Sequence, residues 1–352
     1  MINLPDRYST VLKILDGGGM SDTLLCQDSH LDRPVVIKRL KDGIEKHRLL
    51  DELAALSSIR SKYVVQILDV IYANDEIVGL VEEYIDGVEL VPLEHPFDRI
   101  DALNCLYPIF SGVAEIHIHE RLHRDLKPDN MKLDGAGTLK VFDFGLAKLA
   151  SNAKTRKLYF TEGYAAPEIF QVDASGNHNF TKAVDVFAAG VISLWMIQKG
   201  ELPNPLYNIP PKLPCVDFAV LGAPLSPAVA QILNRTLSEN PADRPSAEEV
   251  RATLARELLF DRHRMLLTYA GQAHVLSAKK RSVSLSSGPN SIKMEYDGYD
   301  FVVTAVTGTV RINNSMVNVG DKLHGSVVIV LQSPGGYPTS ITADQSNPEV
   351  IQ

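Results

Sequence analysis

The stretch that most constrains this chain is a dense run of charged and amide side chains, HRDLKPDN, at residues 123–130. Twelve residues separate it from the tripeptide DFG at residues 143–145. Long apolar segments lie on either side, LNCLYPIFSGVAEIHIH (103–119) and AVDVFAAGVISLWMI (183–197), and both are apolar enough to be buried helices. Polar groups of this density between core helices form either a loop whose charges pair with one another or a cluster assembled for chemistry.

The two polar strings resemble those of the eukaryotic-like protein kinase family, Ser/Thr branch. The likeness extends over about residues 8–260, with the motifs in the family's order. The resemblance implies an α+β fold, a two-lobed protein-kinase-like catalytic domain. It also implies phosphoryl transfer, which requires the γ-phosphate, the metal ions and the accepting hydroxyl to be held in line with their charges neutralised.

Four residues of the strings take catalytic or metal-binding roles under this resemblance. Asp125 would orient the substrate hydroxyl and accept its proton, and Lys127 would neutralise the phosphate in transfer. Asn130 and Asp143 would hold Mg²⁺ ions, which are hard cations that prefer oxygen ligands.

A lysine and a glutamate further upstream complete the set that the resemblance implies. Lys38 ends the strand-like VVIK, where the family places the lysine that contacts the α- and β-phosphates of ATP. Its partner is expected on a helix, and residues 46–59 carry apolar side chains at a helical period. Glu52 fits better than Glu45, because ELAALSSIRSKYVV repeats the family's spacing of Glu, leucine-type residues and paired valines.

The segment LVEEYIDG is expected to contact the adenine. The resemblance gives hydrogen bonds from adenine to the Glu83 carbonyl and the Ile85 N–H, with Val36 on the facing wall. Two residues depart from the family pattern. Glu82 stands where an apolar residue is usual and is expected to pair with a cation or water behind the purine, and Lys132 lies where an apolar side chain usually packs beneath the base.

The segment DGGGMS, which begins at Asp16, lies between two strand-like runs. The frame G-x-G-x-x-G falls on Asp16, Gly18 and Ser21, so only its middle position is glycine. We interpret the segment as the phosphate-covering loop, with Gly17, Gly18 and Gly19 supplying the flexible backbone. An ordinary hairpin turn is the other interpretation.

The string TEGYAAPE resembles the segment that presents and anchors the substrate site. Thr161 is expected near Asp125 and Lys127, and Glu168 is expected to pair with Arg244 of NPADRPSAEEV. Asp185 is expected to hold the catalytic loop backbone from a core helix.

Arg124 is the residue that in many relatives binds a phosphate on the activation segment. The usual phosphate-bearing position falls on Lys157, and the nearest hydroxyl is that of Thr155. The sequence therefore predicts either autophosphorylation at Thr155 or activity without an activation-segment phosphate.

The composition changes after the helical part of the chain. Residues 272–352 are rich in Val, Ser, Thr, Gly and Asn, alternate with period two, and contain turn signals such as NN, DG and GG. We predict a catalytic domain at residues 8–265 and a small all-β accessory domain at residues 272–352. The accessory domain is expected to contact a partner or the catalytic domain.

Net charge and cysteine usage limit the other classes. The charge of −8 gives no general affinity for nucleic acid or anionic membrane. Cys26, Cys105 and Cys215 are far apart, without the spacing of metal ligands. With no membrane-length apolar run and no signal-peptide pattern, the chain is expected to be cytoplasmic.

The motifs together predict ATP- and Mg²⁺-dependent transfer of the γ-phosphate to Ser/Thr hydroxyls of proteins, including autophosphorylation. Two alternatives stay open. A pseudokinase scaffold is favoured by the altered glycine loop, Glu82 and Lys132. A small-molecule kinase of the same fold would lack the APE-type anchor and a residue like Lys127. The protein substrate does not follow from the sequence.

Overall fold

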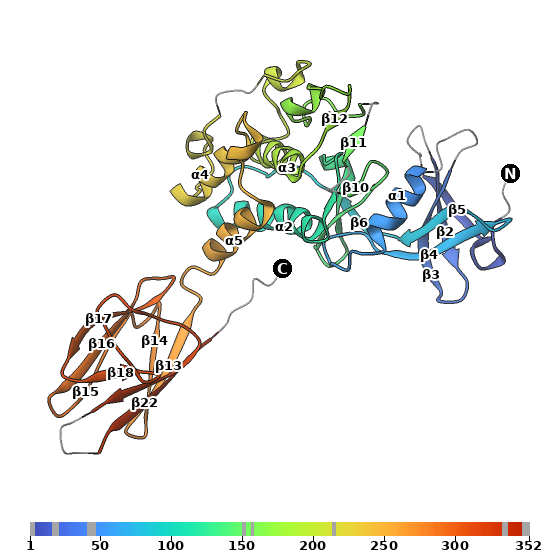
Figure 1. Cartoon of the computed structure of the whole chain (residues 1–352). Coiled ribbons are helices and arrows are strands. Elements are labelled where there is room, and N and C mark those ends of the chain that lie inside the picture. Colours follow the sequence, from blue (N-terminus) through green and yellow to red (C-terminus); the bar gives the residue numbers. More distant parts are fainter. Residues whose placement is uncertain are drawn as a thin grey trace. The chain divides into compact units, whose positions relative to one another are not determined.

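The computed structural model describes residues 4–15, 21–40, 47–149, 153–155, 158–212, 216–332 and 337–346. The chain divides into two compact units, Met1–Leu254 and Ala255–Ile351 (Figure 1). The division falls between Leu254 and Ala255, within the helix α5 (Ala247–Leu258), whereas the predicted catalytic domain ends at residue 265. Among the described residues, no helix has the length and apolar character needed to cross a membrane.

The first part of the first unit is a five-stranded antiparallel sheet with one helix. The strand order is β1-β2-β3-β5-β4. The elements are β1 (Val11–Leu15), β2 (Ser21–Asp28), β3 (Arg33–Leu40), α1 (His47–Leu56), β4 (Ile67–Ala73) and β5 (Glu76–Glu83). A small core packs against this sheet and comprises Tyr8, Cys26, Val35, Ile37, Ile71 and Val81. Helix α1 lies within the predicted helical stretch, 46–59.

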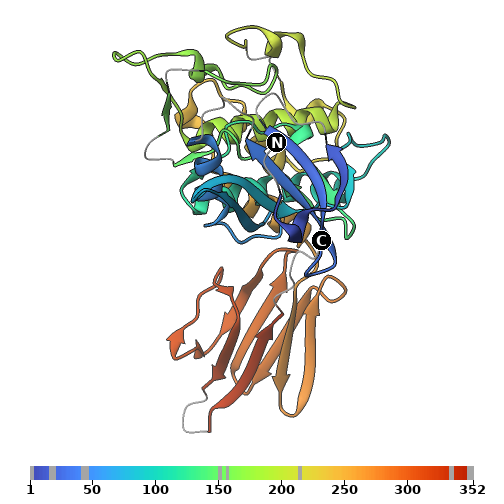
Figure 2. The ribbon, with the colours of Figure 1, turned by 90° about the vertical axis from the view of Figure 1, so that its right-hand side faces the viewer.

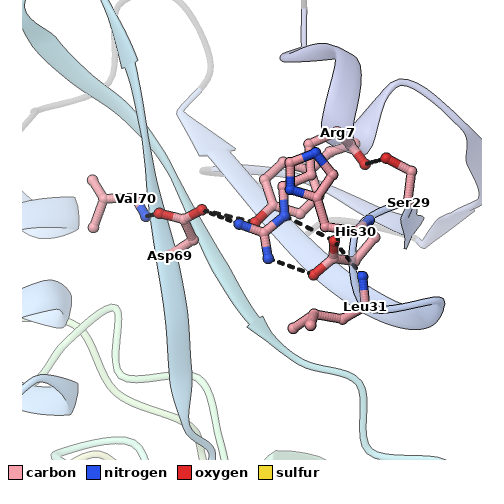
Figure 3. Close-up of polar contacts among 8 residues, drawn as sticks. Arg7, Ser29, His30, Leu31, Asp69 and Val70 are labelled. Atoms are coloured by element: carbon pink, nitrogen blue, oxygen red, sulfur yellow. Dashed lines mark hydrogen bonds and ion pairs between the residues drawn. The ribbon is translucent and has the colours of Figure 1, made fainter.

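A polar cluster fastens the chain ahead of β1 to this sheet (Figure 3). The Arg7 guanidinium donates to Asp28 at 2.8 and 2.7 Å and to Asp69 at 3.2 Å, and the Tyr8 hydroxyl also donates to Asp69. The hydrogen bond from Arg7 lowers the pKa of Asp28 despite its burial, so the carboxylate stays charged. The short helix η1 (Asp6–Tyr8) is therefore joined to both β2 and β4.

The rest of the first unit is mainly helical. Its helices are α2 (Arg99–Ile118), α3 (Lys182–Ile197), α4 (Pro227–Thr236) and α5 (Ala247–Leu258). Helices α2 and α3 are the two predicted core helices, and most of their residues are buried. Gly190 lets α3 approach α4 closely, because a Cβ there would lie 2.1 Å from the Thr236 hydroxyl oxygen.

Short strands and 3₁₀ turns join these helices and carry the site. The strands are β6 (Gly87–Glu89), β7 (Arg121–Leu122), β8 (Met131–Asp134), β9 (Leu139–Val141), β10 (Lys148–Leu149), β11 (Lys154–Thr155) and β12 (His178–Asn179). They pair as β6-β8-β9, β10-β7 and β11-β12. The short turn η2 (Pro128–Asn130) ends the polar string, directly before β8.

The described part of the second unit consists of the end of α5 followed by strands and loops (Figures 1 and 2). Two antiparallel sheets have the orders β14-β13-β22-β21-β18-β19 and β15-β16-β17-β20. The strands are β13 (Arg264–Tyr269), β14 (Gln272–Ser277), β15 (Ser282–Ser287), β16 (Asn290–Tyr296), β17 (Phe301–Thr307), β18 (Val310–Ile312), β19 (Ser315–Met316), β20 (Lys322–Leu323), β21 (Ser326–Leu331) and β22 (Thr339–Gln345).

The pattern of period two produces the core of this second unit. Along β16 the residues are alternately buried and half-buried. The predicted NN turn, Asn313–Asn314, joins β18 to β19 with φ of 45° and 69°, values that asparagine tolerates better than most residues. The strand-rich C-terminal region agrees with the predicted all-β character.

Candidate active site

The polar string folds into a loop between β7 and β8 whose side chains converge on Asp125. The Thr161 hydroxyl donates to Asp125 Oδ1 at 2.6 Å, and Lys127 Nζ lies 3.3 Å from Asp125 Oδ2. Lys127 also donates to Thr161 Oγ1 at 3.3 Å. The structure therefore brings together three residues that the sequence expected to be neighbours, from segments 36 residues apart.

Asn130 closes this cluster. Its amide nitrogen donates to the Asp125 carbonyl at 2.8 Å and to Asp125 Oδ2 at 3.2 Å. Because the nitrogen faces Asp125, the side-chain carbonyl oxygen is the atom that Asn130 has for a cation.

The loop backbone is held by the buried carboxylate of Asp185 on α3. Asp185 accepts from the His123 N–H at 2.9 Å, the Arg124 N–H at 2.8 Å and His117 Nε2 at 3.0 Å. Burial opposes the charged form, but the hydrogen bond and charge of His117 outweigh it and lower the pKa of Asp185. Arg124 has φ of 72°, in the left-handed region that disfavours side chains, so the loop needs this support.

Lys38 is the cation at the centre of a second, acidic cluster. Its Nζ lies 2.8 Å from Glu52 Oε1, 3.5 Å from Glu82 Oε2 and 3.6 Å from Asp143 Oδ1. Burial would lower the pKa of Lys38, but the charges of Glu52, Glu82 and Asp143 raise it above its usual value. Lysine therefore stays protonated.

Glu52 also connects α1 with the DFG segment, because its Oε1 accepts from the Phe144 N–H at 3.1 Å. Of the two glutamates considered as partners of Lys38, Glu52 makes the ion pair. Glu45 lies outside the described residues.

Asp143 and Asn130 provide a donor set that suits a hard divalent cation. Asp143 has φ of 63° and its side chain is half exposed. Against the effect of burial, the charge of Lys38 lowers the pKa of Asp143, so its carboxylate is ionised. A carboxylate and an amide oxygen are the kinds of ligand that Mg²⁺ accepts alongside water and phosphate.

Glu82 lies at the end of β5 and is only 2% exposed. Its Oε2 faces Lys38, which is therefore the cation in the predicted pairing. Its Oε1 is buried and has no hydrogen-bond partner among the described residues. Burial raises the pKa of Glu82 to about 7, although Lys38 opposes this shift.

The neighbouring positions of the predicted adenine site lie on facing strands. Val36 on β3 is paired in register with Glu82. The Glu83 carboxylate accepts from Lys140 Nζ at 2.8 Å and from the Gln66 N–H, which fixes this turn of the chain.

Two further positions complete this region. Ile85 is buried. Lys132 Nζ lies over the Phe142 ring, 5.8 Å from its centroid, in a cation–π contact.

The glycine loop is not part of this geometry. Gly17, Gly18 and Gly19, together with Asp16, lie outside the described residues, so their interpretation as the phosphate-covering loop stays a prediction.

The expected anchor of the substrate segment is present. Glu168 in η4 (Pro167–Phe170) accepts two hydrogen bonds from Arg244, at 2.6 and 2.8 Å. Arg244 is buried and also lies over the Phe187 ring, at 4.9 Å. Such bidentate pairs fix both distance and orientation.

Sequence analysis missed two residues that shape this region. Phe180 lies beneath the Arg124 guanidinium, 3.8 Å from its ring centroid, and Lys140 neutralises Glu83. Neither belongs to a local motif. Both contacts join positions more than 50 residues apart, so no pattern within either segment signals them.

Comparison with known proteins identifies the class. A model of the protein kinase domain matches residues 9–254. The match covers well over half of the chain, and this chain belongs to the protein kinase domain family. The family uses ATP as substrate together with a divalent metal.

The most similar relatives include bacterial enzymes. The serine/threonine-protein kinase PrkC of Bacillus subtilis is 33% identical over 208 residues, 56% of this chain and 31% of that protein. The probable kinase PknA2 of Bifidobacterium longum is 29% identical over 276 residues, 72% of this chain and 35% of that protein. The probable kinase PknB of Lactococcus lactis is 31% identical over 210 residues, covering 56% and 32%. The chain therefore spans about a third of the length of these curated relatives.

Proposed function

We propose that this chain transfers the γ-phosphate of ATP, with Mg²⁺, to Ser and Thr hydroxyls of proteins, its own among them. The observation that carries the proposal is the cluster of Asp125, Lys127, Thr161 and Asn130, which surrounds one carboxylate with donors at 2.6–3.3 Å. This arrangement suits the reaction because phosphoryl transfer depends on positioning and charge neutralisation.

In the proposed mechanism, Asp125 orients the substrate hydroxyl and accepts its proton. Thr161 and Lys127 keep the Asp125 carboxylate in one orientation through their contacts with its two oxygens. Lys127 then places its positive charge beside the phosphate in transfer. Asn130 and Asp143 would hold Mg²⁺, which when bound neutralises charge on the phosphates.

Lys38 is proposed to contact the α- and β-phosphates, with Glu52 holding it in place. The 2.8 Å ion pair and the second bond from Glu52 to the Phe144 N–H support this assignment. The adenine is proposed to meet the Glu83 carbonyl, the Ile85 N–H and the Val36 side chain.

Phosphate transfer from γ-labelled ATP to a generic Ser/Thr protein substrate tests the proposal. Asp125→Asn is expected to reduce the rate by at least about 100-fold, since general-base catalysis contributes ~10²–10⁴-fold. Asp129→Asn is the matched control, because Asp129 lies in the same loop but is exposed. Transfer by Asp125→Asn at the wild-type rate would refute the assignment.

The same assay separates the alternatives. A pseudokinase scaffold would bind nucleotide in a thermal-shift titration without transferring phosphate. A small-molecule kinase would not label protein, and phosphoamino-acid analysis of labelled protein would identify Ser and Thr. The paired Glu168 and Arg244 and the Lys127–Thr161 contact favour a protein substrate.

We further propose that residues 8–265 contain the catalytic domain and residues 272–352 the accessory domain, which contacts a partner or the catalytic domain. The boundary is testable with a fragment that ends at His263, after α5 and before β13. This fragment is expected to remain soluble and to retain transfer. Loss of solubility would show that the catalytic part needs the second unit.

A further inference from the structure

We propose that Glu82 is a specificity-determining residue of the nucleotide site. Its Oε1 accepts one hydrogen of the exocyclic amine of adenine and thereby favours 6-amino over 6-oxo purine nucleotides. The inference rests on the proposed function, because it requires that the site bind a purine nucleotide.

The first observation is the state of the Glu82 carboxylate. The residue is 2% exposed, and Oε2 lies 3.5 Å from Lys38 Nζ. Its Oε1 is the one buried carboxylate oxygen without a hydrogen-bond partner among the described residues. A buried acceptor without a donor is costly, so this oxygen has reason to gain one when a ligand binds.

The second observation is where this oxygen lies. Glu82 directly precedes Glu83, whose carbonyl is the proposed acceptor for the adenine amine, and its strand partner is Val36, on the facing wall of the same site. The side chain projects to the same side of the sheet as Lys38. The carboxylate therefore adjoins the two positions that would bracket the base.

The number of donors and acceptors then indicates which ligand group fits, namely the exocyclic amine of adenine. The exocyclic amine of adenine carries two N–H hydrogens, and the Glu83 carbonyl takes only one of them. Glu82 Oε1 is an acceptor beside it for the second. A 6-oxo purine offers an acceptor at the same position, and at pH 8, where Glu82 is mostly ionised, this acceptor meets a carboxylate oxygen with no proton between them.

Lys38 does not remove this preference. It is shared among three carboxylates, and its shortest contact, 2.8 Å, is to Glu52. Glu82 receives only the longer contact, to Oε2, and its other oxygen is buried without a donor among the described residues.

The test is a cycle of four dissociation constants, for ADP and inosine 5′-diphosphate on wild type and on Glu82→Gln. Diphosphates avoid turnover, and pH 8 keeps Glu82 mostly ionised. Wild type is expected to prefer ADP. In Glu82→Gln, whose amide can donate to a 6-oxo group, this preference is expected to fall by about tenfold, the size of one hydrogen bond to a charged group.

The controls separate this effect from general damage. Glu76→Gln removes an exposed carboxylate from the same strand and is expected to keep the wild-type preference. Glu82→Met is the second variant, should Glu82→Gln fail to fold, and also lowers the preference. The preference is a ratio, so a weaker phosphate contact affects both nucleotides alike and cancels.

Two results overturn the inference. Binding of both diphosphates with a preference within about twofold of wild type in the Glu82 variants would show that Oε1 takes water or a cation instead. Absence of binding of either nucleotide to wild type would overturn the proposed function as well. The two failures are thus distinguishable.

Discussion

Asp185 and Glu82 are buried to nearly the same extent, 1% and 2% exposed, yet their surroundings differ. Asp185 accepts three hydrogen bonds from the catalytic loop and α2, and its pKa is lowered. Glu82 faces one lysine at 3.5 Å, has an oxygen without a donor among the described residues, and has a raised pKa. A buried acid whose two oxygens both accept hydrogen bonds supports the fold, whereas one with an oxygen that lacks a donor has an acceptor left for a ligand.

The comparison predicts that substitutions near Glu82 and substitutions near Asp185 impair different properties of the protein. Substitutions around Glu82 should affect activity or nucleotide choice more than folding, whereas substitutions around Asp185 should mainly lower the free energy of unfolding. The only tryptophan of the chain, Trp195 in α3, reports unfolding of the first unit by fluorescence.

The largest effect is expected for Lys38→Met. The variant removes the cation shared by Glu52, Glu82 and Asp143 while keeping a side chain of similar length. Transfer from ATP should fall by at least about 100-fold, because the phosphates lose a positioned charge. The Trp195 unfolding transition should stay cooperative but move to lower urea, because Glu52 and Glu82 are buried and lose their cation. Lys13→Met, on exposed β1, is the matched control for transfer. Unimpaired transfer by Lys38→Met would place the phosphates elsewhere.

Asp185→Ala should affect stability most. It leaves the His123 and Arg124 N–H groups without their acceptor inside the core. The free energy of unfolding should fall by about 3–5 kcal/mol, as for other buried charged networks that lose one partner. Urea unfolding followed by Trp195 fluorescence measures the loss. Exposed Glu201→Ala should remain within ~0.5 kcal/mol of wild type. A similarly small change in Asp185→Ala would mean that the loop does not depend on this carboxylate.

The two acids should also give stability slopes of opposite sign with pH. The folded pKa of Glu82 rises from 4.5 to about 7, so its stabilising contribution is complete below 4.5 and is lost as pH rises through 7. The pKa of Asp185 is lowered, so its contribution is present above the ordinary value and is lost on acidification.

Glu82→Gln isolates the first slope. Relative to wild type, the variant should gain stability between pH 5 and pH 8, by at most about 3 kcal/mol at 1.36 kcal/mol per pKa unit. Urea unfolding of both proteins at four pH values in this range checks the sign. Parallel stability curves would contradict a raised pKa at Glu82.

The contrast also shows what the sequence could predict. Lys38, Glu52, Asp125 and Asn130 belong to motifs that resemble those of the protein kinase family, and the resemblance implies that they meet in one site. The helices 103–119 and 183–197 are predicted from their high apolar content, and alternation predicts the strands after residue 272. Each of these features depends on residues that are close together in the sequence, so a single sequence is enough to predict it.

The remaining features depend on contacts between distant segments. The sequence flagged Glu82 as unusual, but its rotamer toward Lys38 and its unpaired oxygen follow from the register of β3 with β5. Phe180 beneath Arg124 required the path of the chain between them, and the strand order of the second unit depends on which edges pair. No single-sequence pattern contains that information.

The smallest effect is expected in the activation segment, where the contacts are again largely complete. Residues 153–155 are tied to 178–180: β11 pairs with β12, and the Phe180 N–H donates to the Ala153 carbonyl at 3.0 Å. The Arg124 guanidinium packs 3.8 Å from the centre of the Phe180 ring, where it gains a cation–π contact.

These contacts favour activity without a phosphate on Thr155, the second of the two sequence predictions, because backbone pairing and the aromatic ring already hold the segment beside Arg124. Thr155→Ala should therefore change the transfer rate by less than about twofold. Phe180→Leu should lower the transfer rate by roughly threefold, since a cation–π contact contributes ~0.5–1 kcal/mol at partly exposed sites.

Lys157 lies outside the described residues, so Lys157→Glu tests the sequence prediction alone. Initial rates of wild type and the three variants at saturating ATP show whether activity depends on Thr155 phosphorylation or on the Phe180 contact. If Thr155→Ala loses most activity while Phe180→Leu keeps it, phosphorylation and not the aromatic contact orders the segment. The contacts seen between residues 153–155 and 178–180 would then be insufficient without an added phosphate.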